Sequence, residues 1–354
     1  MFSDIYEGRR VLVTGHTGFK GSWLCLWLAS LGAQVRGFAL PPDTRPSHWD
    51  LLDLRAIDDV RGDLRNPAAV EAAIREWQPD VVFHLAAQPL VRRSYREPVA
   101  TFDTNVMGLV HVLETLRKTP SVRVFVNATT DKVYAEAIRP DGYVEADPLG
   151  GHDPYSTSKA CAELVTESYR KSFLAPTVQM ATARAGNVIG GGDWAEDRLV
   201  PDIVRAIAAR TRLDIRNPSA VRPWQHVLEP LSGYLRLGQA LLQNEVSSHA
   251  WNFGPSADAN LPVAGLIDGI REHWPELSVA VSPGPHPHEA EVLRLDCRLA
   301  VQELGWTPVW DAGETIRRTV AWYSAYLADG TIRSMDDLAA YSQAARARGL
   351  SWAA

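Results

Sequence analysis

The sequence predicts an α/β protein with a doubly wound parallel sheet and a smaller, mostly helical second lobe. Two patterns carry this prediction. In the first half of the chain, short apolar runs alternate with segments of helical length and spacing. After Gly190 the alternation stops, and proline clusters separate further helical segments. Strands that alternate with helices pair in parallel, and right-handed crossovers then place helices on both faces of the sheet.

The first half of the chain supplies the expected sheet. Arg10–Thr14 is a short apolar run that ends at glycines, which is typical of a buried parallel strand. Further strands are expected at 33–40, around Val60, and at 80–86, 122–128 and 178–184. The connecting helices are expected at 20–31, 67–76, 99–117 and 156–173. In the second lobe, helices are expected at 199–210, 230–243 and 264–273. The amphipathic tail at 336–349 predicts a terminal helix.

Composition narrows the class of protein. At 354 residues and 46% hydrophobic content, the chain is long for one compact domain. A net charge of −6 argues against nucleic-acid binding, which requires a basic surface. The cysteines, Cys25, Cys161 and Cys297, have neither disulfide nor metal spacing, which fits a reducing cytoplasm. The richest apolar stretch, 23–31, is too short to cross a bilayer, and no leader pattern precedes it.

A glycine-rich turn follows the first strand and opens the first helix. It reads Gly15-His-Thr-Gly18-Phe19-Lys20-Gly21. Glycines in this position permit a tight turn and let backbone N–H groups reach a pyrophosphate, whose charge the helix N-terminus favours. The strand–turn–helix context favours a cofactor site over a plain chain reversal. We therefore expect a Rossmann-type fold, with a dinucleotide-binding domain at 1–186. Residues 187–354 should mainly form the substrate lobe, with some segments returning to the first domain.

The second expected strand lacks one feature of this site. An acidic residue at its end would hold the ribose hydroxyl of NAD. The strand instead ends Arg36-Gly-Phe-Ala-Leu40, with no acid before Asp43. Arg36 lies too early in the strand to bind the extra phosphate of NADP. This element therefore leaves the choice between NAD and NADP open.

A tyrosine and a lysine form the expected catalytic pair. Tyr155 and Lys159 stand at the start of a helix that follows Pro154. A spacing of four residues places both side chains on one helical face, about 5–6 Å apart at the Cβ atoms. The ammonium, together with a positive nicotinamide, would lower the pKa of the phenol towards neutrality, so that it can take a hydroxyl proton as hydride leaves. A surface Tyr–Lys pair is the alternative.

With these motifs, the chain resembles the extended short-chain dehydrogenases/reductases that act on nucleotide sugars. Shared blocks are Gly62-Asp-Leu64, His84-Leu-Ala-Ala-Gln88, Asn105-Val-Met-Gly108, and Asp296 through Leu304-Gly-Trp-Thr-Pro308. Within that branch, other blocks resemble the CDP-glucose 4,6-dehydratases. They are Gly15 through Leu24, Thr130-Asp-Lys132, Pro148 through Tyr155, Arg184 through Trp194, Arg222 through Gly233, and His286-Pro-His-Glu-Ala290. The resemblance extends from about Gly8 to Trp322.

The resemblance implies roles for individual residues. Tyr155 would take the 4-hydroxyl proton, Lys159 would activate it and bind the nicotinamide ribose, and Thr130 would hydrogen-bond the same hydroxyl. Near the cofactor, the adenine would contact Asp63 and Leu64, and the ribose and pyrophosphate would contact Ala86 and Ala87. The family implies NAD that stays bound and is regenerated in each turnover, which favours NAD over NADP.

Asp131 and Lys132 stand where many related dehydratases have Asp-Glu. In those enzymes the aspartate protonates the departing 6-hydroxyl and the glutamate removes the C5 proton. A lysine can act as that base only when it is neutral, which requires neighbouring positive charge to lower its pKa. The alternative is that Lys132 only pairs with Asp131 or with a phosphate.

A nucleoside diphosphate requires cationic and hydrogen-bonding partners in the second lobe. Candidates for substrate binding are Asn187, Arg198, Arg222, His226 and His288. A purely structural Arg222 packed on tryptophan is the alternative for that residue. The His286-Pro-His288 spacing would suit a metal, but no cysteine or further acidic cluster accompanies it beyond two glutamates, so we expect no metal.

Alternative functions stay open at this stage. The chain could be a 4-epimerase, or a dehydratase for another nucleotide sugar. Thr130-Asp-Lys132 favours a dehydratase, because epimerases generally have no acid–base pair for eliminating the 6-hydroxyl. A non-catalytic dinucleotide sensor is a remote alternative, since such proteins usually lose the tyrosine or the lysine. The resemblance implies that the helices at 99–117 and 156–173 pack in a four-helix bundle between two subunits, which gives a homodimer, with a homotetramer as the alternative. We expect no nucleic-acid or membrane partner.

Overall fold

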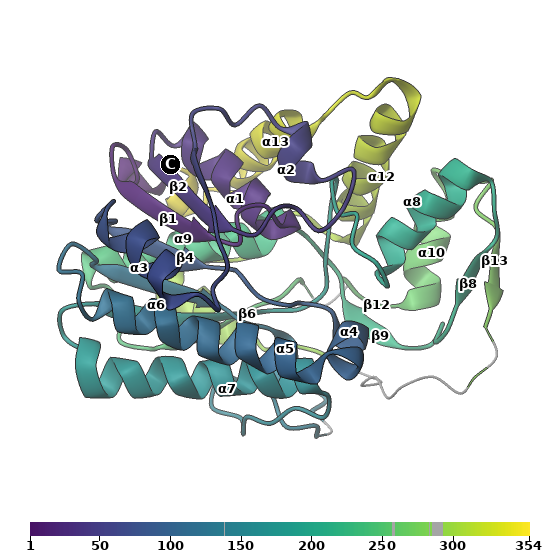
Figure 1. Ribbon diagram of the computed structural model, residues 1–354. Helices are drawn as coiled ribbons and strands as arrows, with labels where there is room; N and C mark the ends of the chain where they lie inside the picture. Colours follow the sequence, from purple (N-terminus) through teal and green to yellow (C-terminus); the bar gives the residue numbers. More distant parts are fainter. Residues whose placement is uncertain (138, 257–258, 283, 285–292) are drawn as a thin grey trace.

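A seven-stranded parallel sheet forms the centre of the molecule (Figure 1). The computed structural model describes residues 1–137, 139–256, 259–282, 284 and 293–354. The strands lie in the order β11-β6-β5-β4-β1-β2-β3, and each neighbouring pair is parallel. Their bounds are Arg10–Thr14 (β1), Gln34–Ala39 (β2), Asp58–Arg61 (β3), Val81–His84 (β4), Val124–Ala128 (β5), Gln179–Ala185 (β6) and Ala250–Phe253 (β11). The strand order reverses between β1 and β4, which confirms the predicted doubly wound fold.

Helices cover both faces of this sheet because successive side chains of a strand point to opposite faces. On β1, Val11 and Val13 enter one core, whereas Leu12 enters the other. The first core includes α1, α9, α11 and α13, and the second includes α3, α6 and α7 (Figure 1). Their bounds are Phe19–Ser30 (α1), Pro67–Arg75 (α3), Gly108–Leu116 (α6), Pro154–Tyr169 (α7), Leu228–Gln243 (α9), Arg298–Leu304 (α11) and Ser334–Ala347 (α13).

A second lobe has a separate apolar core and appears at the right of Figure 1. It contains α8 (Leu199–Ala209), α10 (Val263–Arg271) and α12 (Ala312–Asp329). Short two-stranded sheets join β8 to β13, β9 to β12 and β7 to β10. Their bounds are Val188–Ile189 (β7), Leu213–Ile215 (β8), Val221–Pro223 (β9), Gln225–His226 (β10), Asn260–Pro262 (β12) and Val279–Val281 (β13).

The placement of α9 in the second lobe was wrong. This helix packs against β5, β6 and β11, and its apolar residues belong to the core of the sheet. Leu231, Tyr234 and Leu235 are fully buried there. Strand β11, which the sequence did not indicate, lengthens the sheet beside β6, so that α9 covers a wide apolar face rather than a lobe surface.

The expected helix at 99–117 consists of three consecutive segments. These are α5 (Pro98–Phe102), a π-helical turn (Asp103–Met107) and α6. Within the π turn, Asn105 accepts a hydrogen bond from the backbone N–H of Gln88 and donates to Ser158 Oγ. A π turn changes the direction in which one side chain points without ending the helix. It thereby ties the segment after β4 to α7.

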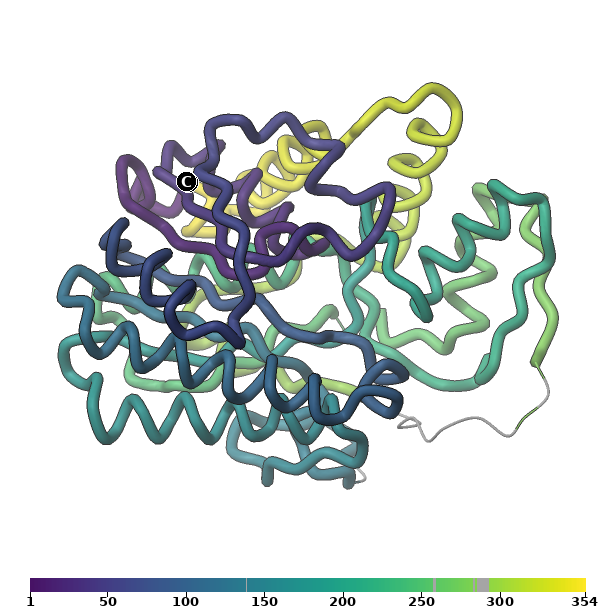
Figure 2. The backbone as a smooth tube through the Cα atoms, viewed as in Figure 1, coloured from purple at the N-terminus to yellow at the C-terminus, as the bar shows by residue number. Residues whose placement is uncertain are grey.

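The two ends of the described chain lie side by side, as Figure 2 shows for the purple and yellow segments. The ring of Phe2 stacks on that of Trp352, with 5.2 Å between the ring centroids. Within the described ranges, no helix has the length and apolar character that crossing a membrane requires. The same residues contain no group of three or more metal-ligating side chains.

Candidate active site

A cavity of about 1490 Å³ opens at the carboxyl ends of the strands and extends into the second lobe. Nearly all of the predicted site residues line it. From the sheet side come Gly15, Gly18, Phe19, Lys20, Gly21, Asp63, Leu64, Ala86, Ala87, Thr130, Asp131, Lys132, Tyr155 and Lys159, and from the lobe side Asn187, Arg198 and Arg222. The structure therefore brings together residues that lie far apart in the sequence.

The glycine turn has the shape that a dinucleotide requires. Gly15 has a φ of +77°, and a Cβ atom there would lie 2.7 Å from the backbone of Ala86. A Cβ on Gly21 would overlap the carbonyl of Gly15. Gly18 precedes α1 without a side-chain cap, so the first N–H groups of the helix are left for a ligand. These residues fit a pyrophosphate bound at the start of α1.

Lys20 extends from this turn towards the catalytic residues. Its ammonium lies 6.0 Å from the ring centroid of Tyr234. The pKa of Lys20 is lowered to about 7, mainly by burial and also by the nearby charges of Arg198 and Lys159, while the charge of Asp131 opposes this shift. The turn therefore places an amine that titrates near neutral pH close to the reaction centre, in addition to its backbone N–H groups.

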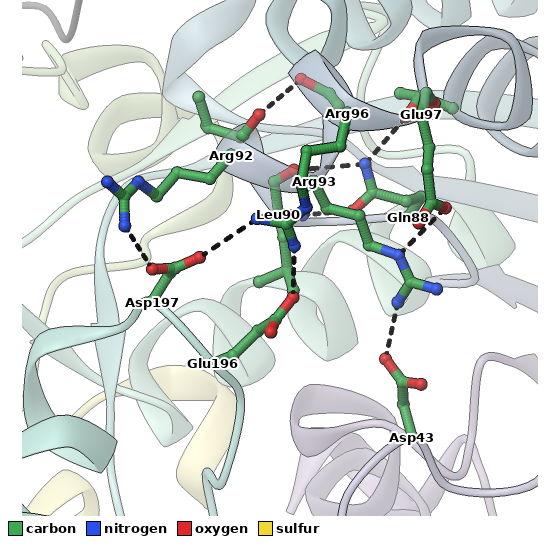
Figure 3. Close-up of polar contacts among 12 residues, drawn as sticks. Asp43, Gln88, Leu90, Arg92, Arg93, Arg96, Glu97, Glu196 and Asp197 are labelled. Carbon is green, nitrogen blue, oxygen red and sulfur yellow. Dashed lines mark hydrogen bonds and ion pairs between the residues drawn. The ribbon is translucent and has the colours of Figure 1, made fainter. Parts of the chain in front are cut away.

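Acidic residues line the cofactor end of the cavity. Asp63 is held by Arg65, whose Nη2 lies 2.6 Å from Oδ2, and the guanidinium lowers the pKa of this carboxyl. Asp43, beyond the end of β2, also lines the cavity and accepts a hydrogen bond of 2.9 Å from Arg93 Nη1 (Figure 3). The first acidic residue after β2 thus lies at this cavity and is paired with Arg93.

Helix α7 positions the expected catalytic pair. Asp153 caps this helix by accepting a hydrogen bond from Ser156 N, and Pro154 occupies its first turn. Tyr155 and Lys159 are both buried, and Lys159 Nζ donates to the carbonyl of Ala128 at the end of β5, at 2.9 Å. The lysine is therefore fixed at the carboxyl edge of the sheet.

In the chain alone the pKa of Tyr155 is raised, whereas we expect Lys159 together with a positive nicotinamide to lower it. Burial raises it to about 12, and the charge of Asp131 adds to this rise. A hydrogen bond with Thr130 and the charge of Arg198 oppose the rise without cancelling it. Burial also lowers the pKa of Lys159 to about 8. In the chain alone, desolvation of the phenolate thus outweighs the cations around it.

A short turn after β5 holds the proposed acid beside this tyrosine. Thr130 Oγ1 donates to Asp131 Oδ1 at 2.9 Å. Asp131 is only 1% exposed, and its Oδ2 has no hydrogen-bond partner among the described residues. Lys132 Nζ lies 3.5 Å from Asp131 Oδ1, with a partly exposed side chain. The contact fits the pairing role for Lys132 that the sequence left open.

Of the residues expected to bind substrate, Asn187, Arg198 and Arg222 line the cavity. Arg198 Nη1 lies 3.0 Å from Asp193 Oδ2. The Oδ1 atom of Asn187 is buried without a hydrogen-bond partner in the described part of the chain. His288 lies outside the described residues.

His226 is not placed to contact a ligand in this cavity. It is fully buried, does not belong to the cavity lining, and lies between the rings of Trp23 and Trp310, with centroids 6.0 and 4.8 Å away. Burial lowers its pKa to about 3, so the ring is neutral. Its assignment to substrate binding was wrong, because the motif that contains it turns into the core after Arg222.

Sequence reasoning missed a set of ion pairs at the rim of the cavity. Helix α4 (Val91–Arg96) carries arginines that reach the segment before α8 (Figure 3). Arg92 Nη1 lies 2.7 Å from Asp197 Oδ1, and Arg96 Nη2 lies 2.9 Å from Glu196 Oε1. The run Val-Arg-Arg-Ser-Tyr-Arg was a visible basic signal, but its acidic partners are about a hundred residues away.

The doubly wound sheet, the glycine turn and the buried Tyr155–Lys159 pair define an extended short-chain dehydrogenase/reductase. The sequence model of the family described as GDP-mannose 4,6 dehydratase matches residues 12–319. The chain therefore belongs to that family of sugar-nucleotide enzymes.

Curated relatives cover almost the whole chain. A CDP-glucose 4,6-dehydratase of Salmonella typhimurium is 47% identical over 333 residues, which are 92% of this chain and 93% of the relative. A CDP-paratose 2-epimerase of Salmonella typhi is 31% identical, covering 89% of this chain and 99% of the relative. A dTDP-glucose 4,6-dehydratase of Xanthomonas campestris is 26% identical, over 88% and 92%.

Solved structures share the fold at lower identity. The UDP-glucose 4-epimerase of Thermotoga maritima has a TM-score of 0.79 and 22% identity, covering 90% of this chain and 99% of that one. The dTDP-glucose 4,6-dehydratase of Bacillus anthracis, solved with NAD, has a TM-score of 0.74 and 22% identity, over 90% and 97%. Dehydratases and epimerases thus use the same architecture, so the chemistry must be argued from the site.

Proposed function

We propose that the protein catalyses the NAD-dependent dehydration of CDP-glucose to CDP-4-keto-6-deoxyglucose, a step of deoxysugar biosynthesis. The observation that carries this proposal is the placement of two sets of groups in one cavity. Tyr155 and Lys159 suit oxidation at C4, and the buried carboxylate of Asp131 lies in contact with Thr130 beside them. The 47% identity to a CDP-glucose 4,6-dehydratase supports the same substrate.

The cofactor would occupy the cavity from the glycine turn to α7. The chemistry that NAD would supply there is uptake of the hydride from C4 and its return to C6, which would make the reaction redox-neutral. The N–H groups at the start of α1 would hold its pyrophosphate, and Asp63 and Leu64 would border its adenine. Solved relatives described with NAD, such as the dehydratase of Bacillus anthracis, support this choice.

The residues of the chain would then move the protons. Tyr155 takes the 4-hydroxyl proton, assisted by its hydrogen bond with Thr130. Because burial raises the Tyr155 pKa to about 12, a positively charged nicotinamide would be needed to stabilise the phenolate further. Asp131 would give a proton to the departing 6-hydroxyl, and the C5 proton, acidified by the 4-keto group, would pass to a neutral Lys132 or to water. When hydride returns to C6, C5 takes a proton back, and the proton that Tyr155 took would replace the one that Asp131 gave. One water leaves, and no net oxidant is consumed.

The second lobe would hold the nucleotide. Asn187, Arg198 and Arg222 line the cavity on that side and offer the charge and hydrogen bonds that a diphosphate requires. The division into a cofactor domain at 1–186 and a mainly substrate-binding part at 187–354 is part of this proposal. A 4-epimerase is the second candidate, because epimerases share this fold, but an epimerase has no use for Asp131 as an acid.

We also propose that the enzyme is a homodimer that acts in the cytoplasm. Large apolar side chains are exposed on the helices facing away from the sheet: Val99 is 81% exposed, Leu164 60% and Phe173 56%. A second copy that packs its own α5–α6 segment and α7 against this face would cover them.

The scattered free cysteines are consistent with a reducing compartment.

The test combines product analysis with an isotopic label. The protein is incubated with NAD and CDP-, UDP-, dTDP- and GDP-glucose in turn, and the 4-keto product is measured. CDP-glucose carrying deuterium at C4 should yield product with the label at C6. Loss of the label to solvent, or release of stoichiometric NADH, contradicts internal hydride transfer. Turnover of another nucleotide sugar alone contradicts the substrate assignment.

A further inference from the structure

The lobe end of the cavity is formed by the end of β8 and the residues that follow it. Ile215, Arg216 and Asn217 line it together with Asp202 from α8 and Val263 from α10. Strand β9 lies nearer to the sheet than β8 does (Figure 1). A Cβ atom placed on Gly186 would contact both Pro223 and the carboxylate of Asp131. Strand β9, which ends at Pro223, therefore adjoins the catalytic centre. The segment after β8 thus lies farther from the catalytic centre than β9, which carries Arg222.

Arg216 carries an unused donor in this region. Its Nη1 is buried and has no hydrogen-bond partner among the described residues. Asp202 is close enough for the two charges to interact, but no ion pair within 4.0 Å joins them. By contrast, Arg205 in the same lining donates to Trp194 O, Ala195 O and Asp202 Oδ1. Because a buried donor without a partner is costly, its retention points to a ligand that satisfies it.

The position of Arg216 identifies the part of the substrate that it meets. This step rests on the proposed function, in which the glucose lies at Tyr155 and Asp131 and the diphosphate at Arg222. A nucleotide sugar laid along the cavity in this order places its base at the segment after β8. The guanidinium has parallel N–H donors and no acceptor, so it suits a base edge with two adjacent acceptors.

We propose that Arg216 selects the cytosine base by donating hydrogen bonds to its O2 and N3 atoms. Cytosine presents these two acceptors side by side. Uracil and thymine carry a proton on N3, which would face the N–H groups of the guanidinium and lose one hydrogen bond. The arginine therefore discriminates against UDP- and dTDP-sugars as well as favouring CDP-sugars.

The experiment measures nucleotide binding rather than turnover, so that it does not depend on the chemistry. Dissociation constants of CDP and UDP are determined by calorimetry for the NAD-loaded wild type and for Arg216→Met. Arg212→Met is the matched control, because Arg212 flanks the same strand, is 63% exposed and does not line the cavity. We expect the wild type and the control to prefer CDP. Arg216→Met should lose CDP affinity by about 10- to 100-fold, with little change for UDP.

A second variant keeps the side chain polar. In Arg216→Gln the amide can donate to one base atom and accept from N3–H, so the preference should shift from CDP towards UDP. This variant also serves if Arg216→Met fails to fold, as judged by its thermal transition. Equal weakening of CDP and UDP would mean that Arg216 binds phosphate or ribose, which overturns the proposal. An unchanged CDP preference in both variants overturns it as well.

The outcomes separate this proposal from the proposed function. Wild-type protein that prefers CDP through Arg216, yet forms no 4-keto product from CDP-glucose, would retain base recognition and lose the dehydratase assignment. If the wild type dehydrates CDP-glucose and neither Arg216 variant changes the preference for CDP, the dehydratase assignment stands and the role of Arg216 in base recognition is excluded.

Discussion

Glu163 and Arg184 form a buried ion pair between the catalytic helix α7 and strand β6. Arg184 Nη2 lies 2.8 Å from Glu163 Oε2, and both side chains are 4% exposed. Thr182 Oγ1 and Arg184 Nε donate to the same carboxylate. Glu163 is four residues after Lys159 on α7, and its charge raises the pKa of that lysine against the effect of burial. One carboxylate therefore joins α7 to β6 and supports the catalytic lysine.

Glu163→Gln should reduce stability strongly. Removing one partner of a buried ion pair leaves the other charge uncompensated, which typically costs about 3–5 kcal/mol. The free energy of unfolding is measured by urea denaturation. Glu167→Gln is the matched control, because Glu167 pairs with Arg170 one turn later on the same helix but is 38% exposed, so its loss should cost no more than about 1 kcal/mol. Equal losses in the two variants would contradict the prediction.

Asp131→Asn should separate oxidation from elimination. The variant keeps the shape of the side chain but cannot donate the proton that the 6-hydroxyl needs. NADH absorbance in a single turnover should still appear, while formation of the 4-keto-6-deoxy product falls by about 10²–10⁴-fold. A variant that eliminates water at the normal rate would exclude Asp131 as the acid.

Lys132→Met should distinguish the two roles of that lysine. If Lys132 removes the C5 proton, the variant should lose exchange of that proton with heavy water in the 4-keto intermediate. If Lys132 positions Asp131, as their 3.5 Å contact favours, exchange should persist while elimination or substrate affinity declines. Exchange is followed by mass spectrometry. Normal exchange together with normal turnover would leave the lysine without a chemical role.

Much of this site could be predicted from the sequence because its residues follow strands. In a parallel sheet the carboxyl ends meet at one edge, so the segments after β1, β4, β5 and β6 had to converge there. Long-range packing could not be predicted in the same way. The sequence of α9 predicts a helix that could pack in either lobe. Its position depends on β11, which pairs with β6 and extends the sheet that α9 covers. The burial of His226 likewise depends on Trp23 and Trp310, which are remote in sequence.

Glu229 should make stability depend on pH. Its carboxylate is fully buried and accepts hydrogen bonds from Val309 N, Trp310 N and Tyr341 Oη. Burial raises its pKa to about 7, whereas the ordinary value is 4.5. Between these values the folded state keeps a proton that the unfolded chain releases. The stabilisation of the folded state that this group contributes is therefore fully present below about pH 4.5 and is lost as the pH rises through 7.

The Glu229→Gln variant provides the comparison for this pH effect. Its free energy of unfolding should change less between about pH 5 and pH 8 than that of the wild type, by up to about 3 kcal/mol. Urea denaturation at several pH values measures both curves. Parallel curves would assign the pH dependence to other groups.

The neighbouring position of β6 and β11 in the sheet has a consequence for how the chain folds. These strands pair directly, yet the segment from Gly186 to His249 lies between them and supplies α8, part of the second lobe and α9. The edge of the sheet can therefore form only after a long loop has closed. Closing this loop costs conformational entropy before the contacts between β6 and β11 can compensate for it. Proteins with such non-local pairings fold slowly for their size. We expect the sheet from β3 to β6 to assemble early, with its apolar face exposed until α9 and β11 arrive.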